Sequence, residues 1–113
     1  MPAQLNDCPV ERVFSMLSGR WKIPIYRHLH TSRGPVRYSE LLRHLPAISG
    51  KMLTEQLREL EADGIVERTV TPDIPPKTKV EYSLTPQGRS MIGFLDRMSE
   101  WGIAHIRNLG PEQ

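Results

Sequence analysis

Apolar residues recur at helical spacing over most of the chain and alternate with polar residues in its second half. The helical repeats predict helices at about 9–17, 21–30, 40–45, 49–63 and 86–107. The alternation predicts a very short strand at 36–38 and longer strands at 65–71 and 79–84, the latter two joined by a proline-rich tip. This order indicates a mainly helical fold with one small antiparallel β-hairpin.

Several residues have the chemistry that begins or ends a helix. Ser49 has a hydroxyl suited to capping the helix that follows it, and Gly64 suits the left-handed position just after that helix. Ser39 is expected to cap the short helix at 40–45. Thr85 and Pro86 are expected to open the last helix, which should continue to about residue 107 although two glycines weaken it.

The helix at 49–63 has two contrasting sides. At 100° per residue, Leu53, Leu57 and Leu60 form one narrow apolar stripe. A small, polar and partly basic face lies opposite and carries Lys51, Glu55 and Arg58, with Thr54 beside them. A helix that leucines fix to a core while such a face stays outside has the surface of a major-groove reader. An ordinary amphipathic surface helix is the alternative.

The order of elements predicts a winged helix-turn-helix. The helix at 40–45 would cross the DNA backbone, the helix at 49–63 would enter the major groove, and the hairpin would form a wing with a basic tip. The residues expected to contact DNA are Arg37, Ser39, Ser49, Lys51, Thr54, Glu55, Arg58, Lys77 and Lys79. Three acidic residues near the end of the helix at 49–63 are expected to form a solvated face: Glu59, Glu61 and Asp63.

Charge and composition narrow the function further. The 113 residues suit a single domain, and their net charge of +2 is unevenly distributed. Residues 20–58 hold eight Lys and Arg against two Glu, which suggests one positive face, although scattered arginines that only solvate helices are the alternative. No apolar run is long enough to span a membrane, and residues 1–7 lack a secretory signal pattern, so a cytoplasmic location is expected.

Enzyme and metal chemistry find little support in the sequence. No nucleophile triad, glycine-rich phosphate loop or paired acid/base carboxylates are evident, so no catalytic residue is expected. The four histidines match no compact metal motif, so neither a metal nor another cofactor is expected. The lone Cys8 excludes an intrachain disulfide. It precedes a predicted helix, whose dipole favours a reactive thiolate, although most lone cysteines are idle.

Short segments in a consistent order carry a family resemblance. They are Cys8–Glu11, Gly19–Lys22, Arg37–Leu41, Ile48–Thr54, Leu57–Gly64, Val80–Thr85 and Trp101–Gly102. Together they resemble the HxlR-type family of bacterial winged-helix transcriptional regulators, over about residues 8–107. The resemblance implies dimers that bind inverted-repeat operators, and sensing of oxidants or electrophiles through the cysteine that Cys8 matches. Two departures are Gly50, where the family often has a polar residue, and Pro24, in a helix that is usually free of proline.

We therefore expect a single HxlR-type domain over residues 1–113, with an ordered core at 8–107, that acts as a homodimeric, sequence-specific DNA-binding regulator. Repression is favoured over activation. The first and last helices should form the dimer through Val13, Ile92, Leu95, Met98, Trp101 and Ile106. The expected partners are double-stranded DNA, a second copy of the chain, and a small oxidant, electrophile or ligand, with no membrane.

Three alternatives stay open at this point. The chain would be a winged-helix protein-interaction module if its outer helix face did not suit phosphate. It would be a regulator released by a non-covalent ligand if Cys8 were idle. It would be a thiol-dependent enzyme if a base stood beside Cys8, and the sequence shows no such base.

Overall fold

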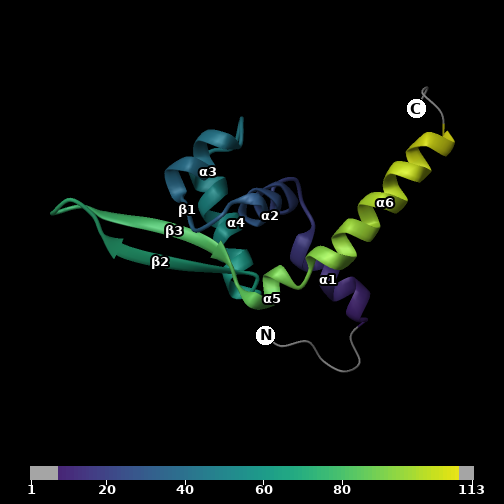
Figure 1. The fold of residues 1–113 in the computed structure, drawn as a ribbon, viewed down its shortest axis with the longest axis horizontal. Coiled ribbons are helices and arrows are strands. Elements are labelled where there is room, and N and C mark those ends of the chain that lie inside the picture. Colours follow the sequence, from purple (N-terminus) through teal and green to yellow (C-terminus); the bar gives the residue numbers. More distant parts are fainter. Residues whose placement is uncertain (1–7, 110–113) are drawn as a thin grey trace.

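A computed structural model describes residues 8–109, so the ends of the predicted 1–113 domain lie outside the described residues. Figure 1 shows a helical body from which a β-hairpin and a long helix project in opposite directions. The helices are α1 (Pro9–Leu17), α2 (Lys22–Thr31), α3 (Tyr38–His44), α4 (Gly50–Ala62), α5 (Pro86–Arg89) and α6 (Ile92–Leu109). The strands are β1 (Val36–Arg37), β2 (Val66–Pro72) and β3 (Thr78–Leu84).

The strands form one small antiparallel sheet in the order β1-β3-β2. Val36 lies opposite Tyr82, and Val66 lies opposite Leu84. All four of these side chains are buried, so one face of the sheet at the base of the hairpin closes the core that α2, α3 and α4 form. The predicted mainly helical fold with a small antiparallel hairpin is confirmed. Between β2 and β3 the hairpin extends outward as the wing (Figure 1).

The turn between α3 and α4 holds the two helices at a fixed angle. Ile48 is buried in this turn, and Ala47 has a φ of 71°, a left-handed conformation that is uncommon for a residue with a side chain. The Ser49 hydroxyl accepts a hydrogen bond from the Met52 backbone N–H at 3.0 Å, so the predicted cap of α4 is confirmed. Gly64 has a φ of +76°, as its position after the helix requires.

The predicted start of α3 was wrong. The helix begins at Tyr38 rather than Glu40, because β1 ends at Arg37 with an extended backbone and the helix follows at once. Ser39 therefore lies inside the first turn with an exposed side chain and does not cap the helix.

The predicted single last helix was also wrong, since α5 and α6 are separate. Thr85 caps α5 by accepting from the Gly88 N–H at 2.9 Å, as its position before Pro86 predicted. The Gly88 carbonyl then accepts the Tyr26 hydroxyl at 2.6 Å and the Met91 N–H at 3.2 Å. Burial raises the pKa of Tyr26, so its phenol stays protonated and able to donate. These contacts and the buried Met91 side chain turn the chain before α6 begins.

α6 gives the molecule its elongated outline. None of its 18 residues is fully buried. The radius of gyration is 16.3 Å, whereas a compact domain of ~100 residues has about 13 Å. No helix between residues 8 and 109 is long and apolar enough to cross a membrane. The C-terminal part of α6 therefore extends away from the rest of the structure (Figure 1).

Candidate nucleic-acid interface

The α4 helix is fixed to the core along one side. Leu53, Leu57 and Leu60 are each at most 1% exposed, so the predicted stripe is confirmed. A buried cation adds a second attachment, because the Lys22 ammonium in α2 lies 2.6 Å from a Glu59 carboxylate oxygen in α4. Burying an ammonium is favourable only with such a partner. The orientation of α4 is therefore set by both packing and an ion pair.

Tyr38 in α3 holds the first turn of α4. Its hydroxyl donates to the Gly50 carbonyl at 3.0 Å and lies 3.1 Å from the Thr54 hydroxyl. A Cβ at Gly50 would lie only 3.3 Å from this phenolic oxygen, so a larger residue there would press on Tyr38. The sequence pattern did not indicate this role for Tyr38. The structure assigns it the placement of α4 and explains the glycine at position 50.

The outer face of α4 is open to solvent. Lys51, Glu55 and Arg58 are all exposed, on the side opposite the leucines. Thr54 is half-buried, since its hydroxyl meets Tyr38. Ser49 is exposed at the helix start, where its hydroxyl is already occupied by the cap. Two cations and one carboxylate thus stand free on the face that the sequence predicted.

A hollow of about 460 Å³ lies between α4 and the hairpin. Its lining residues are Tyr38, Thr54, Arg58, Glu61, Arg68, Val80 and Tyr82. Arg68 on β2 lies opposite Tyr82 on β3, so the wing places a second guanidinium in the hollow that Arg58 lines. Burial raises the pKa of Tyr82, and a hydrogen bond from Arg68 opposes that rise. The sequence did not single out Arg68, because alternation alone does not show which strand residue faces α4.

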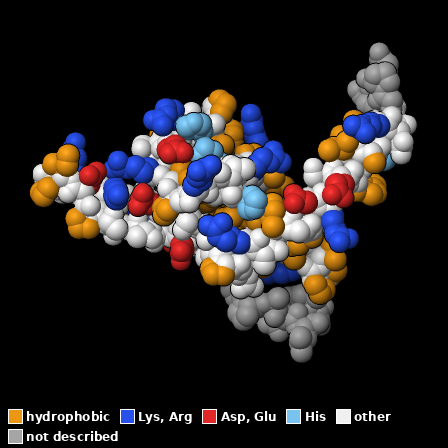
Figure 2. All heavy atoms as spheres, viewed as in Figure 1, with side chains coloured by type: hydrophobic (Ala, Val, Ile, Leu, Met, Phe, Trp, Pro, Cys, Tyr) orange, Lys and Arg blue, Asp and Glu red, His pale blue; other side chains and the backbone are white. Residues whose placement is uncertain are grey.

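The wing carries the remaining predicted contacts. Arg37 lies 3.0 Å from an Asp73 carboxylate oxygen, which ties β1 to the wing tip. The Ile74 backbone N–H, and after it the Arg37 guanidinium, lowers the pKa of Asp73. Lys77 is exposed at the tip, and Lys79 is half-buried, 4.0 Å from a Glu81 oxygen. Figure 2 shows Lys and Arg side chains gathered over the inner part of the wing.

The acidic residues near the end of α4 form the predicted solvated face only in part, because Glu59 is exposed whereas Glu61 and Asp63 are half-buried. Glu59 pairs with Lys22 across the core boundary. Asp63 lies 3.8 Å from the Arg12 guanidinium of α1, and Glu61 lines the hollow. Each acid therefore has a different neighbour, and two of them attach α4 to other helices.

Cys8 is exposed at the residue that precedes α1. Its carbonyl accepts the Arg12 N–H at 3.0 Å, which forms the first turn of the helix. The Arg12 guanidinium lies 3.8 Å from an Asp63 carboxylate oxygen. The thiol is open to reagents from solvent.

A groove of about 280 Å³ runs between α1 and α6. Every residue that lines it is apolar: Pro9, Val10, Val13, Phe14, Leu17, Phe94 and Met98. Beyond the groove, Trp101 is 68% exposed and Ile106 is 64% exposed. Figure 2 shows apolar side chains along the projecting part of α6. Patches of this kind on soluble proteins mark interaction surfaces.

The predicted dimer residues divide into two groups. Val13, Ile92 and Leu95 are half-buried and pack against the core of their own chain. Met98, Trp101 and Ile106 are exposed. The second group is therefore free for a partner, while the first also holds α1 and α6 in place.

The fold also brings together a side-chain cluster that sequence spacing did not indicate. His28 from α2 meets Glu40 and His44 from α3, with ligand atoms within 4.8 Å of one another. Within residues 8–109 this is the cluster with the side chains that a metal ion would need.

A helix-turn-helix with an antiparallel wing, and an α4 helix whose outer face exposes Lys51 and Arg58, are typical of the winged-helix class of DNA-binding regulators. The chain belongs to the HxlR-like helix-turn-helix family, whose pattern matches residues 16–109. Members of this family are transcriptional regulators that bind DNA, so the chain is not an enzyme.

Among curated relatives, the uncharacterized HTH-type transcriptional regulator YtcD of Bacillus subtilis (strain 168) is 48% identical over 109 residues. The match covers 96% of this chain and 83% of that protein. The crystal structure of YtcD superposes with a TM-score of 0.78 at 46% identity, over 89% of this chain and 99% of that chain.

Two regulators solved in their reduced forms have the same fold. The redox regulator HypR in its reduced form gives a TM-score of 0.77 at 43% identity, over 90% of this chain and 97% of that chain. The reduced form of the regulator YodB from B. subtilis gives 0.74 at 42% identity, over 84% of this chain and 90% of that chain.

Proposed function

We propose that the protein is a homodimeric, sequence-specific DNA-binding regulator that represses transcription from an inverted-repeat operator. The observation that carries this proposal is the α4 helix, which three buried leucines, Lys22 and Tyr38 hold in place while Lys51 and Arg58 stay exposed. A rigid helix with free cations on its outer face suits insertion into the major groove. A regulator of this kind shares a compartment with the chromosome, so the cytoplasm is its expected location.

Each predicted contact has a distinct role in this proposal. Lys51, Glu55 and Arg58 read base edges, and Thr54 sits at the margin of that face because its hydroxyl also meets Tyr38. Arg37, Ser39 and Ser49 lie near the DNA backbone at the edges of α3 and α4. Lys77 and Lys79 reach phosphates from the wing, and Arg68 joins them as an addition from the hollow.

The dimer arranges two recognition helices for one operator. The exposed side chains of α6 and the apolar groove beside α1 would cover the same surfaces of a second copy, as a two-fold interface requires. Two α4 helices would then dock in successive major grooves about 34–36 Å apart. A repressor blocks transcription by occupying such a site, and here a dimer would occupy it.

The outer face of α4 supplies the direct test. Replacing Arg58 or Lys51 with alanine should weaken operator binding without unfolding the domain, because both side chains are exposed. A lost base contact should cost about 1–3 kcal/mol at one operator position, whereas a lost phosphate contact should weaken all sequences alike. Fluorescence anisotropy with DNA from upstream of the protein's own gene, titrated with salt, measures both effects.

Arg107→Ala is the matched control for these variants. Arg107 is exposed on α6, which extends away from α3, α4 and the wing in Figure 1. At 100° per residue it points about 120° away from Trp101, so its removal takes away one positive charge outside the proposed DNA and dimer interfaces. Binding that is unchanged in both α4 variants, or reduced equally by Arg107→Ala, would refute the assignment of α4 as the recognition helix.

We also propose that Cys8 makes the regulator sensitive to oxidants and electrophiles. The thiol is exposed and directly precedes α1, whose side chains line the groove shared with α6. HypR was solved in reduced and oxidized forms, and YodB after diamide treatment, and both resemble this chain. Here two Cys8 thiolates, one from each copy, would form a disulfide and pass two electrons to the oxidant. An electrophile would instead bond to one thiolate.

Diamide should therefore release the wild-type protein from its operator, whereas Cys8→Ser should stay bound. A group attached at Cys8 would displace α1 and, through the dimer, the spacing of the recognition helices. Gel-shift titrations with and without diamide, followed by reduction with dithiothreitol, measure the effect and its reversal. Equal release of both proteins would remove Cys8 as the switch and favour a non-covalent ligand in the groove between α1 and α6.

A further inference from the structure

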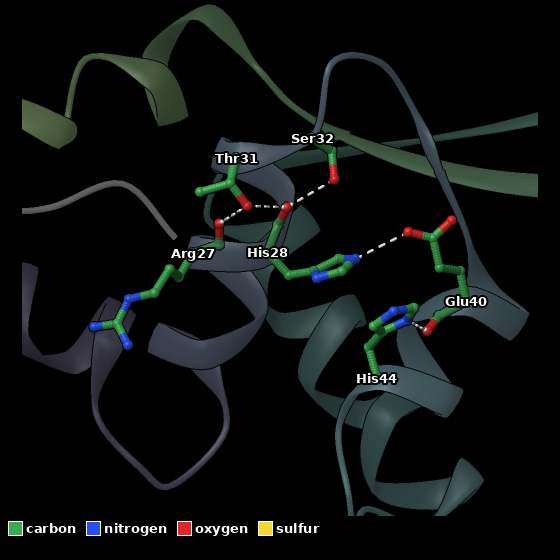
Figure 3. Close-up of polar contacts among 6 residues, drawn as sticks. All are labelled: Arg27, His28, Thr31, Ser32, Glu40 and His44. Carbon is green, nitrogen blue, oxygen red and sulfur yellow. Dashed lines mark hydrogen bonds and ion pairs between the residues drawn. The ribbon is translucent and has the colours of Figure 1, made fainter.

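The end of α2 and the short helix α3 together present two imidazoles and one carboxylate to a common point. Glu40 and His44 are four residues apart in α3, which places them on the same face of that helix. His28 faces them from α2, with its Nε2 atom 3.1 Å from a Glu40 carboxylate oxygen. Figure 3 shows the three side chains turned toward one another. One ligand atom from each lies within 4.8 Å of the others.

A hydrogen bond to the backbone already orients the His44 side chain. The Nδ1 atom of His44 lies 3.1 Å from the Glu40 carbonyl oxygen, and a carbonyl only accepts, so this nitrogen carries the proton. The Nε2 atom of His44 is then left with a free lone pair. Histidines that bind metals commonly hold their other ring nitrogen in this way, because the bond fixes the tautomer and the ring orientation.

The position of His28 is fixed by the end of α2. Its carbonyl accepts the Ser32 hydroxyl at 2.8 Å, the Thr31 hydroxyl at 3.2 Å and the Ser32 backbone N–H at 3.2 Å (Figure 3). The last turn of the helix therefore has little freedom to unwind. Ligands held by rigid elements need little rearrangement to receive an ion.

We propose that His28, Glu40 and His44 form a binding site for a divalent transition-metal ion of the zinc class. Two imidazole nitrogens and one carboxylate oxygen are the ligands that zinc and similar ions prefer, with water or another small ligand in the fourth position. In tetrahedral geometry, ligand atoms about 2.0–2.1 Å from the ion lie about 3.3 Å from one another. The spacing of 3.1 Å between His28 and Glu40 is already close to that value.

The remaining adjustment falls on His44. Its side chain is exposed, so its ring can move toward the other two ligands. This movement would shorten a ligand spacing of up to 4.8 Å to the tetrahedral spacing of about 3.3 Å. Water and ions reach the site from solvent. The Nε2 atom of His28 carries the proton of its hydrogen bond to the Glu40 carboxylate. On metal binding this proton would be released to solvent or the ring would change tautomer to carry it on Nδ1, so that Nε2 and the carboxylate oxygen can both bond to the ion. The bound ion would join α2 to α3 and stabilise the folded chain by mass action, since the unfolded chain has no such arrangement.

Zinc binding to the untagged, chelator-treated protein tests the site. Isothermal titration with zinc chloride should give one ion per chain, and the melting temperature should rise with zinc concentration. Cobalt(II) in place of zinc should give visible absorption bands of a four-coordinate ion. A Cys8→Ser background is run in parallel, because the exposed thiol is a competing ligand. Both backgrounds should give the same zinc affinity.

Variants then identify the ligands. His44→Gln and Glu40→Gln keep the side-chain size and should each lower zinc affinity at least about 100-fold, since even indirect partners of metal ligands contribute 10–100-fold. His105→Gln is the matched control, because His105 stacks on Trp101 in α6, away from α2 and α3. Its zinc affinity should equal that of the wild type.

The proposal fails if zinc binding is absent or does not saturate, as for an ordinary exposed histidine cluster. It also fails if His44→Gln and Glu40→Gln bind zinc as the wild type does, or if Cys8→Ser abolishes binding. Equal melting temperatures of the metal-free variants would establish that each is folded. The zinc experiments do not depend on DNA binding, so they test the metal site independently of the proposed regulatory function.

Discussion

A single charge at Trp101 should convert the dimer into a monomer. Trp101 is 68% exposed on the part of α6 that extends beyond the body of its own chain, so Trp101→Glu removes no contact within the core. In the proposed dimer the same position is covered by a second copy, where an unpaired carboxylate would be buried at high cost. Size-exclusion chromatography with light scattering at micromolar concentration should show a chain of half the wild-type mass.

Loss of the dimer should reduce operator affinity by about 100-fold or more. Binding of one copy to its half-site would then no longer hold a second copy at high effective concentration beside the other half-site. Arg107→Glu is the matched control. It introduces the same carboxylate in the same helix, and at 100° per residue its side chain points about 120° away from Trp101. A dimeric Trp101→Glu protein with full operator affinity would contradict the role of α6. So would equal disruption by Arg107→Glu.

The elements that local pattern predicts well are those whose side chains alternate between one core and solvent. The α4 helix is the best case, because Leu53, Leu57 and Leu60 all face the same core and Ser49 and Gly64 mark its ends. The paired strands were also predicted to within about a residue. Their sequence alternates, and the short β1 strand was found although it has only two residues.

The break between α5 and α6 depends on contacts that no local pattern contains. Gly88 fits between a carbonyl from Ile65 and a hydroxyl from Tyr26, which are 23 and 62 residues away in the sequence. A glycine in an apolar repeat looks like a weak point in one helix. Only the fold shows that it is a point of contact where the chain changes direction.

The functional residues divide in the same way. Lys51, Glu55 and Arg58 could be predicted because their exposure follows from the leucine stripe on the same helix. Tyr38 and Arg68 could not, because their roles depend on α3 and β2 lying beside α4. The metal-site proposal has the same origin, since the side chains of His28, Glu40 and His44 come from two separate helices and meet only when α2 packs beside α3.

The position of Gly88 also predicts a large effect on stability. Replacing it with alanine should destabilise the domain by about 2 kcal/mol or more, since the new Cβ would overlap the backbone carbonyl of Ile65, and overpacking of this kind commonly costs 1–3 kcal/mol. The φ of Gly88 is not left-handed, so alanine could adopt the same backbone conformation. The contact with Ile65 alone opposes the substitution. Helix propensity alone predicts the opposite sign, because alanine favours helices over glycine. Urea unfolding measures the difference.

Gly93→Ala separates the two effects, because Gly93 lies in α6 with nothing within 4 Å of the position where its Cβ would be. The same substitution there should stabilise the chain by up to about 1 kcal/mol through helix propensity. Opposite signs at the two glycines would establish that contact with Ile65, and not the flexibility of glycine, fixes the turn between α5 and α6. If Gly88→Ala were as stable as the wild type, the close approach to Ile65 would be wrong. The orientation of α6 relative to the rest of the structure would then also be wrong. The proposed dimer surface depends on that orientation and would be contradicted with it.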